Sequence, residues 1–306
     1  MPGAFRRCGN SSTVWRFRQQ VSVFMSAIQR VSVHGGHSGQ FCHHAKDSLS
    51  EVVAAYIAAG FTWVGITEHM PPAEDAWRYP DEADANLSAA LLQRRFRDYF
   101  TECRQLRDLH RGQIELFACF ETETYPGSSQ VVRQLLEATK PDYIVGSVHH
   151  VGGIGIDINR ELYAAARDKA GGLAALYCDY FDAQLATLQD LEPAVVGHFD
   201  LIRIFDPDYL DTLKLPAVWQ RVQRNLDFVA RAGLILDFNM RGFDKTAEQY
   251  PSRPVLEAAL ERGIAVVPGD DSHGVSSVGR NYDRGVALLA ELGHDCQWQR
   301  PRLYRW

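Results

Sequence analysis

Histidine is concentrated in one short part of this chain. Four of the eleven histidines lie within residues 31–45, at positions 34, 37, 43 and 44, directly after the β-branched run Val31–Val33. Histidine is the commonest metal ligand in proteins and the usual acid or base near neutral pH. A cluster of this kind needs partners from elsewhere in the chain, and we expect them in similar positions, at the ends of short apolar runs.

Seven short apolar runs predict β-strands, and each is followed by side chains that can bind metal or exchange protons. The predicted strands are Val31–His34, Thr62–Thr67, Glu115–Phe120, Tyr143–Val148, Ala194–Gly197, Leu234–Phe238 and Ile264–Pro268. After the first strand and its histidines, the reactive residues in chain order are Glu68 and His69, Glu121 and Glu123, His149 and His150, His198, Asn239, and Asp271 and His273.

Helical patterns separate these strands. We expect helices at about 47–59, 87–110, 172–188, 216–232, 253–262 and 279–292. Ser48 and Glu51 predict a capping box at the start of the first helix, and Gly60 predicts its end.

Strands that alternate with helices predict a parallel sheet with helical crossovers. An open sheet concentrates its site at one switch point in strand order, whereas the strand ends of a closed barrel all surround one site. Because polar residues follow all seven predicted strands, we predict an α/β fold, a distorted (β/α)7 barrel that forms a single domain over residues 30–306.

The composition excludes several classes of partner. Apolar residues make up 46% of the chain and charged residues 23%, as in soluble globular proteins. A net charge of −6 gives no basic surface for nucleic acid, and no apolar run reaches the about 18 residues that a membrane span needs. The six cysteines are scattered without a CxxC pair, which favours reduced thiols and a cytoplasmic protein.

The segment 1–29 differs from the remainder, because it contains arginine and serine but no acidic residue. This composition is typical of a mitochondrial transit peptide. Met25 lies close to the first strand, however, which favours an unstructured extension or an upstream start. We therefore expect residues 1–29 to lie outside the folded domain.

Imidazole and carboxylate groups without paired thiolates suit zinc, manganese or iron. The candidates outnumber the ligands of one tetrahedral ion, so we expect two or three divalent ions, with a carboxylate such as Glu121 bridging two of them. Glu121 and Glu123 are two residues apart and share one face of a strand. We expect Glu123 to orient a histidine rather than to bind metal.

These residues resemble the polymerase-and-histidinol-phosphatase (PHP) family, and more closely its monofunctional histidinol-phosphate phosphatases of the fungal type. The matching stretches are His37–Lys46 (HSGQFCHHAK), Ile66–Pro71 (ITEHMP), Phe120–Glu123 (FETE), Gly146–Val151 (GSVHHV), Gly197–Asp200 (GHFD) and Gly269–His273 (GDDSH). They follow the order of the family and run from the first strand to the C-terminal region.

The resemblance implies a metal-dependent phosphatase that hydrolyses a small phosphate monoester, L-histidinol phosphate, with catalysis centred on Glu121, Asp271 and His198. It assigns His34, His37, Glu121 and Asp271 to a first ion, Glu121, His149 and His198 to a second, and His44, His69 and His273 to a third. Arg203, after the fifth strand, and Arg241, after the sixth, are our candidates for phosphate contacts.

One spacing departs from the family, which begins with His-x-His where this chain has His34-Gly-Gly-His37. An extra residue turns a side chain to the other face of a strand. We expect Gly35 and Gly36 to absorb it as a bulge, because glycine adopts positive φ. Three alternatives remain: a PHP phosphoesterase for another small phosphate, an amidohydrolase-type metal barrel, and a catalytically impaired PHP-like binding protein.

Overall fold

The structure is a computed structural model that describes residues 28–306. The predicted N-terminal extension therefore lies outside the described residues, apart from Ile28 and Gln29. The carbonyl of Gln29 accepts hydrogen bonds from the Tyr282 hydroxyl at 3.1 Å and the Trp298 indole at 2.7 Å, which tie the start of the described chain to its C-terminal part.

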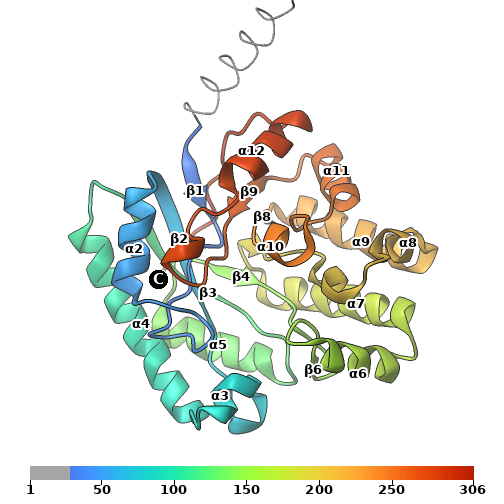
Figure 1. Ribbon diagram of the computed structural model, residues 1–306, viewed down its shortest axis with the longest axis horizontal. Coiled ribbons are helices and arrows are strands. Elements are labelled where there is room, and N and C mark those ends of the chain that lie inside the picture. The colour runs from blue at the N-terminus through green and yellow to red at the C-terminus, as the bar shows by residue number, and fades with distance from the viewer. Residues whose placement is uncertain (1–27) are drawn as a thin grey trace, which may run out of the picture.

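Seven parallel strands form a nearly closed barrel (Figure 1), as the sequence predicts. In spatial order they are β1 (Arg30–Ser32), β2 (Phe61–His69), β3 (Glu115–Glu121), β4 (Ile144–Gly146), β7 (Val195–Val196), β8 (Ile235–Asn239) and β9 (Val266–Gly269). The first and last strands meet just beyond β1, where the Val33 amide donates a hydrogen bond of 2.8 Å to the Pro268 carbonyl. The predicted fold class is confirmed.

Helices surround the barrel (Figure 1). The predicted ones are α2 (Leu49–Ala58), α4 (Ala89–Leu109), α7 (Leu173–Leu191), α9 (Pro216–Ala232), α11 (Arg253–Glu261) and α12 (Tyr282–Glu291). The sequence analysis did not anticipate α3 (Pro80–Asp84), α5 (Ser128–Thr139), α6 (Arg160–Ala170), α8 (Tyr209–Lys214), α10 (Gly242–Thr246) or the hairpin of β5 (His150–Val151) and β6 (Ile154–Gly155). No helix of the described chain is long and apolar enough to cross a membrane.

Local sequence signals fix the ends of the first helix. Ser48 and Glu51 form the predicted capping box of α2, in which each side chain bonds to the other's backbone amide. The helix ends before Gly60, whose φ of +76° is in the left-handed region that favours glycine.

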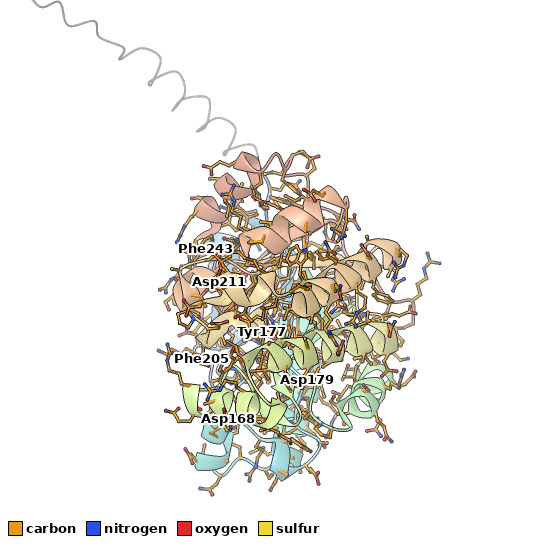
Figure 2. The ribbon with its side chains drawn as sticks, turned by 90° about the vertical axis from the view of Figure 1, so that its right-hand side faces the viewer. Asp168, Tyr177, Asp179, Phe205, Asp211 and Phe243 are labelled. Atoms are coloured by element: carbon orange, nitrogen blue, oxygen red, sulfur yellow. The ribbon has the colours of Figure 1, made fainter. Side chains whose placement is uncertain are left out.

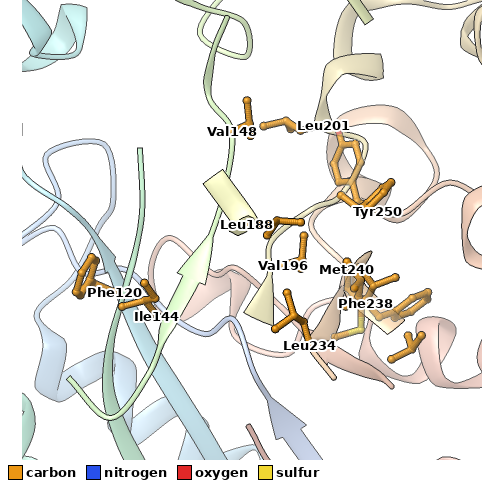
Figure 3. Close-up of a cluster of buried hydrophobic side chains, with 14 of the residues drawn as sticks. Phe120, Ile144, Val148, Leu188, Val196, Leu201, Leu234, Phe238, Met240 and Tyr250 are labelled. Atoms are coloured by element: carbon orange, nitrogen blue, oxygen red, sulfur yellow. The ribbon is translucent and has the colours of Figure 1, made fainter. Parts of the chain in front are cut away.

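The strands present alternate residues to two separate apolar layers. Val145, Val195, Ile235 and Val267 belong to a small cluster that fills the barrel interior. The intervening residues pack outward against the helices, as Figure 3 shows for Ile144, Val196 and Phe238.

Figure 2 shows the helical layer on the side of α6 to α9, where Tyr177 of α7 donates a hydrogen bond of 2.9 Å to the Asp206 carboxylate. This bond ties the helical layer to the loop that follows β7 and η2 (Leu201–Phe205). The five cysteines of the described residues are free, in line with the predicted reduced thiols.

Candidate metal centre

Several candidate metal ligands continue the inward-facing register of the barrel strands. On β3, Cys119 belongs to the interior cluster and Glu121 follows two residues later. In the same way, His149 lies four residues after the inward-facing Val145, beyond the end of β4. Side chains repeat on one face of a strand every two residues. The polar centre therefore lies inside the barrel at the C-terminal ends of the strands, directly beyond the apolar interior residues.

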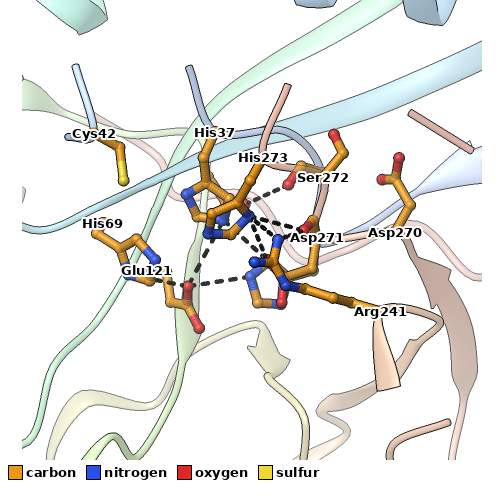
Figure 4. Close-up of polar contacts among 12 residues, drawn as sticks. His37, Cys42, His69, Glu121, Arg241, Asp270, Asp271, Ser272 and His273 are labelled. Atoms are coloured by element: carbon orange, nitrogen blue, oxygen red, sulfur yellow. Dashed lines mark hydrogen bonds and ion pairs between the residues drawn. The ribbon is translucent and has the colours of Figure 1, made fainter. Parts of the chain in front are cut away.

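All nine predicted ligand residues lie around this end of the barrel. The ligand atoms of each of five groups approach one another within 4.8 Å. Three groups contain only predicted ligands, namely His34, His37 and Asp271; His34, Glu121 and His198; and His44, His69 and His273. The other two include a residue outside the predicted ligands, and they are His69, Glu123 and His149, and His37, Cys42 and His69. The first and third groups coincide with two of the predicted ligand sets, except that Glu121 is not part of the first. Figure 4 shows how His37, His69 and His273 gather with Glu121 and Asp271.

Glu121 lies between the groups. One carboxylate oxygen, Oε2, is 3.3 Å from Nε2 of His34 and 3.3 Å from Nδ1 of His69. The other oxygen, Oε1, is 2.8 Å from Nε2 of His198 and 3.4 Å from Nε2 of His149. Because its two oxygens face different histidines, Glu121 has the placement of a bridging carboxylate.

His34 reaches the centre although its spacing departs from the family pattern. The strand ends at Ser32 and the chain bends at Val33 and His34, which turns the imidazole inward. The expected positive φ is wrong, because neither Gly35 nor Gly36 adopts it. Gly35 is instead required by close approach, since a Cβ there would lie 2.4 Å from the Gly65 carbonyl oxygen.

Two carboxylates orient ligand histidines from behind. Nδ1 of His34 lies 2.8 Å from Asp237, and Nδ1 of His149 lies 3.0 Å from Glu123. Such contacts fix the tautomer and present Nε2 to a metal ion. Glu123 therefore occupies its predicted position. Asp237 was not predicted, although a carboxylate within the otherwise apolar run Leu234–Phe238 was a signal.

Of the two adjacent aspartates after β9, only Asp271 faces the centre (Figure 4). Its Oδ1 is 3.2 Å from Nε2 of His37. Asp270 points away and accepts hydrogen bonds from the Ser32 hydroxyl at 2.6 Å and the Tyr56 hydroxyl at 2.9 Å. Asp270 therefore holds the loop in place, while Asp271 remains free for a ligand role.

The residues present fit divalent metal ions. Buried ring nitrogens of His34, His37, His69 and His198 have no hydrogen-bond partner among the described residues. An unpaired buried polar atom is unfavourable, and a metal ion satisfies several of them at once. Burial and the neighbouring His69 lower the pKa of His37 to about 4, so its imidazole is neutral at pH 7, as metal binding requires.

A cavity of about 300 Å³ opens above the centre. Its floor includes Glu121, His149 and Asp271, and its wall includes Arg241, as predicted, and Lys245, which the sequence analysis missed. Arg241 donates a hydrogen bond of 2.8 Å to the Asp271 carbonyl and also contacts His273. The cavity is within the size range of small-molecule sites.

Arg203 does not lie at this cavity, which corrects our expectation of a phosphate contact. Its side chain is buried and bonds to Thr246 and to the carbonyls of Glu248 and Gln249, and its Nε lies 3.6 Å from Asp200. A guanidinium with these partners stabilises the loop and is not available to substrate. Position after a strand did not distinguish it from Arg241, because the short helix η2 carries it away from the barrel axis.

Two residues beside the ligands support the loop rather than the centre. Glu68 faces outward and accepts hydrogen bonds from the Ser38 amide at 2.8 Å and hydroxyl at 2.6 Å, which anchors the loop after His37. Two aromatic residues of the loop after β2 have different surroundings: Tyr79 lines the cavity, whereas Trp77 stacks on Tyr125 with ring centroids 5.2 Å apart.

Comparison with known proteins identifies the family. Residues 35–241 match the model of the PHP domain. A Schizosaccharomyces pombe protein named "Probable histidinol-phosphatase" is 37% identical over 268 residues, which cover 86% of this chain and 87% of that protein. The histidinol-phosphatase of Saccharomyces cerevisiae is 27% identical, over 85% of this chain and 88% of that one. The chain belongs to the PHP family.

A solved structure shares the barrel. The histidinol phosphate phosphatase of Lactococcus lactis, complexed with zinc, L-histidinol and phosphate, aligns with a TM-score of 0.65 at 18% identity. The alignment covers 91% of this chain and 100% of that one. The likeness extends over the whole barrel and supports the fold described above.

Proposed function

We propose that this protein is a histidinol-phosphatase, which hydrolyses L-histidinol phosphate to L-histidinol and phosphate. The observation that carries the proposal is the convergence of nine candidate ligand residues at one end of the barrel, seven of which line a cavity whose wall holds Arg241. The names of the yeast relatives and the ligands of the Lactococcus lactis structure support this substrate.

The ligand residues would hold two or three divalent ions in the predicted sets, with zinc the first candidate. Bound ions of this kind activate water and neutralise charge on phosphoryl oxygens. Glu121 holds the sets together through its two oxygens, and Asp237 and Glu123 keep two histidines in the tautomer that ligation needs. Arg241 adds a fixed positive charge beside Asp271, where the phosphate would lie.

The impaired-protein alternative rested on the spacing between His34 and His37. Both side chains lie in one group with Asp271, so the spacing no longer supports the alternative of an impaired protein. A PHP phosphatase for another small phosphate would use the same floor and differ only in the cavity wall. We therefore retain substrate selectivity as the property to test.

The test combines metal analysis with phosphate release. We expect two or more ions per chain, and turnover of histidinol phosphate that exceeds that of p-nitrophenyl phosphate and other small monoesters. His198→Ala and Asp271→Ala should abolish turnover and reduce metal content while the circular dichroism spectrum is unchanged. A protein that is loaded with metal and inactive on histidinol phosphate would contradict the proposal.

Removal of metal provides a second readout. An ion that binds only the folded chain at 100 times its dissociation constant stabilises by about 2.7 kcal/mol. We expect the melting temperature to rise by several degrees when zinc replaces a chelator, and His198→Ala to reduce this rise. An equal melting temperature with zinc and with chelator would count against the assigned ligand sets.

A further inference from the structure

The cavity above the metal centre is lined by two chemically different sets of side chains. One set comprises the candidate metal ligands, with Arg241 and Lys245. The other comprises apolar and aromatic side chains, among them Tyr79, Ile158 and Tyr250, together with the carboxylate of Asp157. A ligand that fills this cavity therefore meets both positive charge and an acidic group.

Asp157 forms no ion pair within the described residues, although Lys245 lines the same cavity. Its Oδ1 is buried and has no hydrogen bond within that part of the chain. Tyr79 lines the same cavity, and burial together with the nearby carboxylates of Glu123 and Asp157 raises its pKa. An unpaired carboxylate oxygen that has lost its water is unfavourable unless a ligand satisfies it.

The segment that carries Asp157 is held at both sides. The Ile156 amide donates a hydrogen bond of 2.8 Å to the carbonyl of His149, which ties the hairpin of β5 and β6 to the metal-ligand loop. Asn159 caps helix α6 by accepting a hydrogen bond of 2.8 Å from the Leu162 amide. Asp157 therefore has a fixed position relative to the floor, as recognition of a charged ligand requires.

The proposed substrate has the matching charges. Its phosphate carries negative charge and belongs at the floor, where metal ions and Arg241 attract it. Its α-ammonium group is positive, so the same floor repels it and it needs an anion at a distance. The second carboxylate of the lining, Asp81, differs from Asp157 in having no buried oxygen that lacks a hydrogen-bond partner.

We propose that Asp157 binds the α-ammonium group of the substrate and makes the enzyme selective for phosphate esters that carry an amine. This inference rests on the proposed histidinol-phosphatase function. It assigns substrate selectivity to the loop between β6 and α6, which contributes no metal ligand. The contact is a charge-assisted hydrogen bond, which is about twice as strong as a neutral one.

The experiment compares two substrates on three proteins. The substrates are L-histidinol phosphate and 3-(imidazol-4-yl)propyl phosphate, which is the same ester without the amine. The variants are Asp157→Asn and, as a control with the same change in charge, Asp168→Asn. Asp168 lies on the surface of α6 and pairs only with the adjacent Arg167 (Figure 2). Metal content and melting temperature are measured for each protein.

We expect the unmodified protein and Asp168→Asn to prefer the amine-bearing ester by about 10- to 100-fold in kcat/KM, the range that a charge-assisted hydrogen bond supports. Asp157→Asn should lose this preference because its kcat/KM falls for histidinol phosphate alone. Its kcat/KM for the amine-free ester should stay unchanged within about threefold. If Asp157 has only a structural role, its substitution would lower kcat/KM equally for both substrates, and this result would overturn the inference. Failure of the unmodified protein to prefer the amine would also overturn it, whether or not the variant folds.

The two proposals fail in different ways. If the unmodified protein hydrolyses histidinol phosphate no faster than p-nitrophenyl phosphate, the proposed function is wrong, and the ammonium contact is wrong with it. If the unmodified protein is selective for histidinol phosphate and Asp157→Asn keeps its preference for the amine, only the ammonium contact is wrong.

Discussion

At the scale of single residues, similar side chains have different roles according to which way the chain turns after its strand. Arg203 and Arg241 both follow barrel strands in sequence, yet one is buried against Asp200 and the other lines the cavity. Asp270 and Asp271 are neighbours, yet they face opposite directions. The residue type therefore indicates which side chains are candidates, and the local backbone conformation decides which of them face the site.

The two arginines should respond differently to removal of their charge. Arg241→Gln is expected to lower kcat/KM for phosphate release by about 100-fold, as for loss of one group that stabilises developing charge, with stability nearly unchanged. Arg203→Gln leaves Asp200 buried without its partner and should lower the free energy of unfolding by about 3 kcal/mol. Phosphate release and urea unfolding measure the two effects. If Arg203→Gln instead lowered kcat/KM and Arg241→Gln lowered the stability, Arg203 would be the phosphate contact after all.

Asp237→Asn tests the contact behind His34. An amide in place of the carboxylate no longer favours the required tautomer, so metal affinity or activity should fall by about 10- to 100-fold. Competition with a chromophoric chelator measures the affinity. Asp244→Asn, on the exposed side of α10, is the control and should leave the affinity unchanged. Equal affinities for both variants would mean that His34 needs no orienting carboxylate.

At the scale of elements, the sequence predicted most of the architecture because its signals are local. A few adjacent residues specify the capping box of Ser48 and Glu51, and the same holds for the start of α9 at Pro216. The hairpin of β5 and β6 was not predicted, since its two strands are only two residues long each and have no alternating pattern. It nevertheless leads directly into Asp157, so the missed element carries part of the cavity.

The sequence predicted which residues belong to the site, but it did not predict how their side chains contact one another. A shared position after the strands was enough to nominate the nine ligand residues. The contact of Asp237 with His34 and the bonds of Arg203 to the carbonyls of Glu248 and Gln249 join different strands or loops, and no spacing in the sequence specifies them. The bend that brings His34 inward depends in the same way on the packing of Gly35 against Gly65.

That packing yields a prediction for the loop after β1. In Gly35→Ala, the new Cβ would lie 2.4 Å from a backbone carbonyl of β2, which cannot move without shifting the strand. We expect a loss of about 2 kcal/mol in the free energy of unfolding, together with weaker metal binding through displacement of His34. In Gly36→Ala the nearest atom is a side-chain carbon of Val52, at 2.7 Å, so the loss should be smaller. Urea unfolding and metal titration of both variants check this order.

At the scale of the whole molecule, stability should depend on a buried acid beside the cavity. Glu82 of α3 is 7% exposed, and burial raises its pKa from 4.5 to about 7. Between these two values the folded chain binds more protons than the unfolded chain. The contribution of Glu82 to stability therefore falls as the pH rises from about 4.5 to about 7.

Glu82→Gln removes this pH dependence. Relative to the unmodified protein, the variant should gain up to about 3 kcal/mol in the free energy of unfolding between about pH 4.5 and about pH 8. Urea unfolding at both pH values, with chelator present, isolates the effect from metal binding. Asp84→Asn changes an exposed acid of the same helix and should show no such gain. A difference between Glu82→Gln and the unmodified protein that is constant with pH would refute the assignment.

The spread of the ligand residues along the chain has a consequence for how the enzyme is made. The predicted first set joins His34, near the start of the described chain, to Asp271, near its end, and the third set needs His273. On a nascent chain, the first and third sets therefore stay incomplete until the last barrel strand has been synthesised, although the second set is complete at His198. Filling of the whole centre is a late step of assembly, so the ions available to the finished chain decide what the centre contains. The growth medium used for production should thus be recorded in the metal content of the purified protein.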